Sequence, residues 1–291
     1  MIKKLGTIDC DIVETTPFVW RGKLYRFEYI RKRYYANDTG DSYFRIVDTV
    51  SGQHGKPFGK GYHFGSAWAE SDCVYVFGVA QWGGHEIRTF RSYDLINWES
   101  YVNIHLPGFE IFNTSVTRNG DGEYIMLFET GGSSAGKVPF TPRFLESRDL
   151  WNWRLLSEEY IFGADIYTGG HFLIWESGWY YMTYLHCMGG TPVSYMTKII
   201  RSKDLQSWQQ STRGCFMTFC EKDRILYNSD LPMLQQSRLS LAENCNCSDH
   251  EFCEFEGRTV IFYSWGNQLG KEFLAQAIYQ GSMRNLMESF F

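Results

Sequence analysis

The chain has 291 residues, 44% of them hydrophobic and 18% aromatic, and carries a formal net charge of −5. Its Lys and Arg residues are scattered, which argues against a nucleic-acid surface, and it has no apolar run long enough to span a membrane. The 10 Trp, 19 Tyr, 22 Phe and 28 Gly residues favour a large all-β protein, because aromatic residues suit half-buried strands and glycines suit tight turns.

The N-terminal segment MIKKLGTIDCDIVE begins with basic residues but lacks the apolar core of a signal peptide, so we expect a cytoplasmic protein. The eight cysteines have irregular spacing, and free thiols are the expectation in a reducing compartment. Cys245, Cys247 and Cys253 lack the two ligand pairs of a structural zinc site. We therefore predict neither a metal nor a cofactor.

Along the chain, a short apolar strand is repeatedly followed by a tight turn and an aromatic strand, the pattern of a β-hairpin. The turn with its aromatic strand occurs at residues 21–30, 71–80, 120–129, 177–185 and 256–265.

A second motif recurs at a fixed interval. It reads RSYDLINW at 91–98, ESRDLWNW at 146–153 and RSKDLQSW at 201–208. Such a period predicts one supersecondary unit repeated in an array. We expect each segment that ends in this motif to supply a third strand, and the segment after it a fourth. The Asp should cap a turn, and the Trp should pack between units.

Five such units, at about 12–50, 60–102, 108–157, 163–212 and 246–282, predict an all-β, five-bladed β-propeller in a single domain spanning 1–291. Residues 214–244 interrupt the rhythm between blades 4 and 5. We expect a loop and a short helix packed on the propeller there, where they could overhang the central cavity. Domain swapping or a dimer contact is the alternative role.

The inner strand of each blade lines the central channel, and the starts of these strands face one mouth of it. These positions combine carboxylates, hydroxyls and aromatic rings without Lys or Arg, which suits a sugar. They include Glu14, His63, Asn113, Tyr167, Asp249 and Glu251.

Three carboxylates are the best catalytic candidates, because a carboxylate buried at a channel mouth is costly without a purpose. Glu14 and Asp249 come first. Asp249 and Glu251 lie on one face of their strand, and Asp249 is nearer its start. Glu129 is the third candidate. It shares its context, LFET, with Glu28 in RFEY, so this pair belongs either to the site or to the scaffold.

The remaining candidates would contact substrate. Trp82 and Trp265 close strands at the same relative position, and each is either a sugar-stacking platform or packing between blades. Arg45 and Arg143 would either clamp a substrate carboxylate or neutralise buried acids. His63 would bind substrate or be structural. Asn113, Tyr167, Glu251, Asn267 and Gln268 would complete the hydrogen-bonding surface.

The chain resembles the five-bladed propeller glycoside hydrolases of families 43, 32, 62, 68 and 117 and the related mannoside phosphorylases. The resemblance covers nearly the whole chain. It is carried by ETTPFVWRGKLYRFEY at 14–29, the three DL..W motifs, FNTSV at 112–116 and residues 246–268.

The chain departs from the pattern of that superfamily, which usually has an Asp in blade 1, an Asp in blade 3 and a Glu in blade 4. The corresponding positions here are Glu14, Asn113 and residues 167–169, with Asp165 nearby, while blade 5 supplies Asp249 and Glu251. We therefore interpret the chain as a divergent member on the same fold.

This resemblance implies a glycosidase, and our first hypothesis is an enzyme that cleaves a short oligosaccharide by a two-carboxylate mechanism. Glu14 would be the base or nucleophile, and Asp249, with Glu129 behind it, would protonate the leaving oxygen. A sugar-binding propeller without catalysis is one alternative. A glycoside phosphorylase is another, for which Arg45 and Arg143 would have to supply the anion site. The expected partner is a glycoside, with no nucleic acid and no membrane, and the identity of the sugar stays open.

Overall fold

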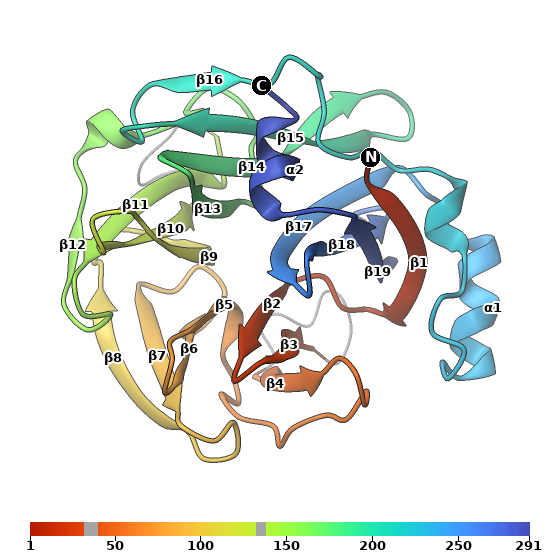
Figure 1. Cartoon of the computed structure of the whole chain (residues 1–291), viewed down its shortest axis with the longest axis horizontal. Coiled ribbons are helices and arrows are strands. Elements are labelled where there is room, and N and C mark those ends of the chain that lie inside the picture. The colour runs from red at the N-terminus through yellow and green to blue at the C-terminus, as the bar shows by residue number, and fades with distance from the viewer. Residues whose placement is uncertain (32–39, 132–137) are drawn as a thin grey trace.

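The computed structural model describes residues 1–31, 40–131 and 138–291, and these form five antiparallel sheets arranged as the blades of a propeller (Figure 1). The predicted fold is confirmed. Blade 1 contains β2 (Thr15–Trp20), β3 (Lys23–Ile30) and β4 (Tyr43–Asp48). Blade 2 contains β5 (His63–Ala69), β6 (Val74–Val79), β7 (Glu86–Ser92) and β8 (Glu99–His105).

The other three blades have four strands each. Blade 3 contains β9 (Ile111–Arg118), β10 (Tyr124–Thr130), β11 (Thr141–Ser147) and β12 (Trp153–Leu155). Blade 4 contains β13 (Phe172–Glu176), β14 (Trp179–Gly189), β15 (Ser194–Ser202) and β16 (Trp208–Gln210). Blade 5 contains β17 (Asn246–Phe255), β18 (Arg258–Gly266), β19 (Glu272–Tyr279) and, unexpectedly, β1 (Lys3–Cys10).

The N-terminal strand closes the ring. β1 pairs antiparallel with β19, from Lys3 opposite Ile278 to Cys10 opposite Phe273. The sequence gives no local sign of this pairing, because β1 has no hairpin partner beside it and its hydrogen bonds reach across almost the whole chain. Blade 5 is therefore built from both ends of the chain, and this holds blade 1 beside blade 5.

The repeated DL..W motif is the turn between the third and fourth strands, as expected. In its first copy, Asp94 accepts hydrogen bonds from the backbone N–H groups of Ile96 and Asn97, each at 2.8 Å. Trp98 stacks on Phe58 of the connection from blade 1, with ring centroids 3.9 Å apart. Asp149 and Asp204 cap their turns in the same way, and Trp153 and Trp208 pack on Phe77 and Phe144 of the preceding blades.

The hydrophobic core lies in the seams between blades. The seam between blades 5 and 1, for example, buries Ile12 and Leu24 against Val260, Phe262 and Leu274. Each of the other four seams has its own cluster of buried residues. This arrangement keeps the channel free for polar side chains from the inner strands.

The insertion at 214–244 contains a short 3₁₀-helix, η2 (Glu221–Arg224), and α1 (Met233–Leu241). Figure 1 shows α1 at the outer edge of blade 5, beside β1, so the expected overhang of the central cavity is wrong. Arg238 anchors α1 to Asp11 with two hydrogen bonds of 2.7 Å, and Leu239 is buried in the seam between blades 4 and 5.

Two short helical segments were not predicted, η1 (Glu158–Tyr160) and the C-terminal α2 (Met283–Glu288). α2 buries Leu286 and Met287. All eight cysteines are free. Within the described ranges, no helix has the length and apolar character needed to cross a membrane.

Candidate active site

A cavity of about 470 Å³ lies at the mouth of the channel where the inner strands begin. All five blades or their connecting loops contribute to it. Its walls include the three predicted catalytic candidates Glu14, Glu129 and Asp249. The other residues lining it are Val13, Arg31, Phe64, Trp82, Asn113, Phe140, Tyr167, Gly169, Gly170, Leu185 and Gln268.

Backbone irregularities aim several of these side chains into the cavity. The register of β17 against β18 shifts between Ser248 and Glu251, and Asp249 inside this bulge has a φ of 49°. Phe64 lies in an equivalent bulge of β5, with a φ of 52°. A bulge turns one residue out of the hydrogen-bonded ladder, so both side chains can reach the channel mouth.

Asp249 lies in a closely packed, half-buried position at the cavity wall. Its carboxylate accepts a hydrogen bond from Ser248, and its Oδ1 rests against Gly170, where an added Cβ would lie 2.9 Å away. Burial, together with the negative charge of Glu14, raises the pKa of Asp249 to about 8. A raised pKa favours the protonated form of Asp249 near neutral pH, and a protonated carboxyl is a proton donor.

Glu14 has a different neighbour. The guanidinium Nη2 of Arg31 lies 3.6 Å from its Oε2. The expectation of a site without Lys or Arg concerned strand starts only, and it missed that the end of β3 reaches the same mouth. Arg31 directly follows that strand, so the antiparallel hairpin that places Glu14 there also places Arg31 there.

Glu129 is held from two sides. Its Oε1 accepts hydrogen bonds from the backbone N–H of His171 at 3.0 Å and from the ring Nδ1 of His171 at 2.8 Å. Asn113 donates to its Oε2 at 3.0 Å. Sequence reasoning missed His171, because it placed the start of the blade 4 inner strand near Tyr167, whereas that strand begins at Phe172. Tyr167 nevertheless lines the cavity.

Glu251 and His63 lie behind the cavity wall. Glu251 is 8% exposed, its Oε2 has no hydrogen-bond partner among the described residues, and burial raises its pKa well above the ordinary value. It faces a chamber of about 10 Å³ beneath the cavity, together with Glu14, His171 and other residues. His63 is 2% exposed, and its Nδ1 lies 2.9 Å from the hydroxyl of Tyr29. Neither residue lines the main cavity.

Trp82 and Trp265, which the sequence places at the same relative position of their blades, have different environments. Trp82 is 44% exposed at the cavity rim and packs against Phe64 with ring centroids 5.1 Å apart. Trp265 is fully buried, stacks on Phe273 and donates its indole N–H to Thr7 at 2.9 Å. Trp82 thus continues an aromatic wall of the cavity, whereas Trp265 packs inside blade 5.

Asn267 and Gln268, which follow Gly266, also have different environments. Gln268 lines the cavity, and its side-chain amide donates to Ser248 at 3.1 Å. Asn267 instead caps its own loop by accepting from the backbone N–H of Leu269 at 2.9 Å, and it is not part of the cavity wall.

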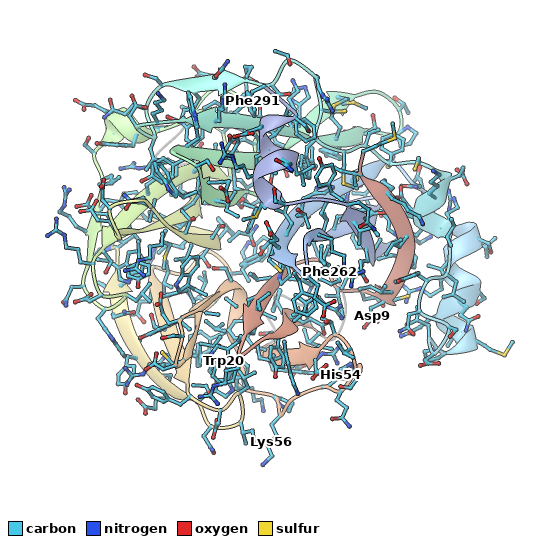
Figure 2. The ribbon with its side chains drawn as sticks, in the orientation of Figure 1. Asp9, Trp20, His54, Lys56, Phe262 and Phe291 are labelled. Atoms are coloured by element: carbon cyan, nitrogen blue, oxygen red, sulfur yellow. The ribbon has the colours of Figure 1, made fainter. Side chains whose placement is uncertain are left out.

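Arg45 neutralises a buried acid, one of its two predicted roles. Its Nε lies 2.6 Å from Glu28, which also binds Arg26, and Arg26 stacks on Phe262. Figure 2 shows Asp9, His54 and Phe262 around this seam between blades 1 and 5. Arg143 is buried over the ring of Phe109, at 5.3 Å from its centroid. Neither Arg45 nor Arg143 lines the cavity, so neither can bind a substrate anion there.

Within the described residues, no group of three or more His, Cys, Asp or Glu side chains has an arrangement that could hold a metal ion. The cavity instead offers three carboxyl groups, one of them with a raised pKa, together with one guanidinium and an aromatic wall.

No family model matches the sequence, and no curated protein matches it either. Solved structures match the fold. An α-L-arabinofuranosidase, CtGH43, from Clostridium thermocellum has a TM-score of 0.57 and 13% identity, covering 86% of this chain and 81% of that one. The GH43_1 enzyme from Xanthomonas citri complexed with xylose has a TM-score of 0.58 and 13% identity, with coverages of 96% and 89%.

A third similar structure is the α-L-arabinofuranosidase PaAbf62A from Podospora anserina in complex with cellotriose. Its TM-score is 0.58 and its identity 10%, and the match covers 94% of each chain. At these identities the likeness establishes the shared five-bladed propeller fold. Function has to be argued from the site.

Proposed function

We propose that this protein is a glycoside hydrolase that cleaves a short oligosaccharide in the central cavity by a two-carboxylate mechanism. The observation that carries this proposal is the pairing of Asp249 with Glu14. The two acids line one cavity and interact electrostatically, and the pKa of Asp249 is raised to about 8. Two carboxyl groups with contrasting environments are what glycosidic cleavage needs.

The different environments of Asp249 and Glu14 suggest which is the acid and which is the base or nucleophile. Asp249 keeps its proton at neutral pH and would donate it to the glycosidic oxygen as that bond breaks. Glu14 has the positive charge of Arg31 beside it, which suits a carboxylate that acts as base or nucleophile. Whether it activates water or attacks the sugar directly depends on the separation of the two carboxyl groups across the substrate.

The other residues would bind and orient the sugar. Glu129 has a fixed position because three hydrogen bonds hold it, and it would accept hydrogen bonds from sugar hydroxyls. Phe64, Trp82 and Tyr167 line the cavity and would cover the apolar face of the ring, as aromatic side chains do in sugar sites. Gln268 would bind hydroxyls on the side of blade 5.

The test is hydrolysis of a panel of aryl glycosides and short oligosaccharides, followed by the Asp249→Asn and Glu14→Gln variants on any substrate cleaved. Each amide keeps the shape and removes the proton-transfer group, so turnover should fall at least about a hundredfold. Glu256→Gln, at a 69% exposed side chain in a turn of blade 5, is the matched control and should retain activity. Near-full activity in either cavity variant would refute the assignment.

Arg31 favours a second candidate, a glycoside phosphorylase, since a cation in the cavity could bind a phosphate co-substrate. Product analysis with and without inorganic phosphate separates the two reactions, because a phosphorylase releases a sugar phosphate and a hydrolase a free sugar. Saturable sugar binding without turnover of any glycoside would instead indicate a binding protein.

A further inference from the structure

A second cavity, of about 710 Å³, shares no lining residue with the candidate active site. It lies at the outer part of the seam between blades 4 and 5, on the side of the ring where Figure 1 places both ends of the chain. Four segments form it. They are the start of the chain with Lys4, the connection from Arg213 to Lys222, Tyr279 at the end of β19, and the C-terminal residues Leu286, Ser289 and Phe290.

The charge of this cavity is one-sided. Lys4, Arg213 and Lys222 line it, and none of the lining residues is acidic. Lys4 is already neutralised, because its ammonium lies 2.5 Å from the buried Asp223. Arg213 and Lys222 are exposed and make no ion pair within the described part of the chain. Two uncompensated cations thus border a cavity in a protein whose net charge is −5.

The floor of the cavity is apolar and aromatic. Phe216, Met217, Leu286 and Phe290 line it and are at most 6% exposed. The rings of Phe216 and Phe290 lie 5.2 Å apart, and the guanidinium of Arg213 lies 5.6 Å from the centroid of Phe290. A ligand seated here would bury an apolar body on the rings and bring one end beside Arg213.

We propose that this cavity binds an organic acid with an aromatic body, its anionic group placed between Arg213 and Lys222. An inorganic anion would leave the aromatic floor unused, and an uncharged aromatic molecule would leave both cations without a partner. Its volume falls within the usual range for small-molecule sites, about 300–1,000 Å³. The site is independent of the function proposed for the channel.

The experiment titrates the full-length protein with 8-anilinonaphthalene-1-sulfonate and, in parallel, with its uncharged analogue N-phenyl-1-naphthylamine. The sulfonate should bind with a stoichiometry of one and at least about fivefold more tightly than the neutral analogue. Its affinity should fall as salt rises from about 0.02 M to about 0.5 M, because screening weakens the attraction between exposed charges.

Variants identify the site. Arg213→Gln and Lys222→Gln should each weaken sulfonate binding about threefold, and the double variant about tenfold, without altering binding of the neutral analogue. Lys56→Gln is the matched control. Lys56 is exposed, and Figure 2 shows it at the opposite edge of the ring from Phe291. All three cations are on the surface, so unchanged thermal melting should show that the variants fold. Unsaturable binding, equal affinity for both probes, or an affinity that ignores Arg213 and Lys222 would overturn the proposal.

Discussion

Glu28 and Glu129 lie in similar sequence contexts, RFEY and LFET. Both are near the ends of the second strands of their blades, blade 1 for Glu28 and blade 3 for Glu129. The structure gives them opposite surroundings. Glu28 is fully buried between Arg26 and Arg45 at the seam with blade 5. Glu129 lines the candidate active site and is held by His171 and Asn113. One carboxylate is neutralised by cations, and the other has only neutral or weakly basic hydrogen-bond partners.

A one-residue offset causes the difference. Phe27 pairs with Thr16 and Leu127 pairs with Ser115, and both of these hydroxyls contact the following blade. The structural equivalent of Glu129 in blade 1 is therefore Tyr29 rather than Glu28. Because the side chains of a strand alternate between its faces, Glu28 faces backward to blade 5 and Glu129 forward to blade 4.

The same equivalence explains the two histidines. Tyr29 contacts His63 of the next blade at 2.9 Å, and Glu129 contacts His171 of the next blade at 2.8 Å. Both contacts join the end of a second strand to the start of the following inner strand. In blade 1 the Tyr–His pair is part of the scaffold, whereas in blade 3 a carboxylate at this position adds a charge to the cavity wall.

The largest expected effect is on stability, in Glu28→Gln. Removing the carboxylate leaves the buried Arg26 without its ion-pair partner and Arg45 with only Asp9, 3.6 Å away. This should cost about 3–5 kcal/mol in the free energy of unfolding. Denaturant unfolding measures this, and activity per folded molecule should be unchanged. Glu146→Gln is the matched control. Glu146 pairs with the 70% exposed Arg154, so its loss should cost at most about 1 kcal/mol. Similar losses in both variants would contradict the comparison.

In Glu129→Gln we expect a smaller loss of stability than in Glu28→Gln and a clear loss of activity. The amide keeps the shape and most of the hydrogen bonding, so the loss of stability should be about 1–3 kcal/mol. Turnover should fall at least about tenfold, because a displaced or uncharged group in the site disturbs the position of the substrate. Steady-state kinetics at a temperature where both variants are folded tests this. If Glu129→Gln loses stability but no activity, Glu129 belongs to the scaffold, as Glu28 does.

The two regions should also respond oppositely to pH. Burial alone would raise the pKa of Glu28, but Arg26 and Arg45 outweigh it and hold the pKa below its ordinary value of 4.5. Its contribution to stability is therefore present above about pH 4.5 and is lost as the pH falls below that value. Asp249, with a pKa raised to about 8, keeps its proton in the folded protein while the unfolded chain releases it near pH 4. Stability should thus decline between about pH 4 and pH 8.

Melting temperature measured across this range, for the wild type and two variants, separates these contributions. Glu28→Gln should remove part of the loss at acid pH, and Asp249→Asn part of the decline toward alkaline pH. Activity should fall above about pH 8, where Asp249 loses the proton that it would donate. If Asp249→Asn leaves the pH dependence of the melting temperature unchanged, this carboxyl is not the source of the decline in stability.

The fold could be predicted because its signals are local and repeated. The hairpins and DL..W turns depend on neighbouring residues, such as Asp94 with Asn97. The closure by β1 depends on partners near the opposite end of the chain, which no local pattern contains. The strand starts predicted Glu14, Asn113 and Asp249 in the cavity. The place of His171 in the site, and the different roles of Glu28 and Glu129, depend on strand positions that differ by a single residue. Sequence patterns do not place a strand that accurately.

The smallest expected effect is on substrate binding, in Trp82→Ala. It extends the comparison to a second pair of residues in equivalent positions, Trp82 and Trp265. Because Trp82 is 44% exposed at the cavity rim, Trp82→Ala should change the melting temperature little. It should raise KM by roughly fivefold if the ring stacks on the sugar, since such contacts contribute about 0.5–1.5 kcal/mol. Trp265→Phe is the control. It removes the hydrogen bond to Thr7 inside blade 5 and should lower stability by about 1–3 kcal/mol without changing KM. A KM change in Trp265→Phe as large as that in Trp82→Ala would show that the rim ring is not a separate binding contact. Both residues would then act only by holding the blades in place.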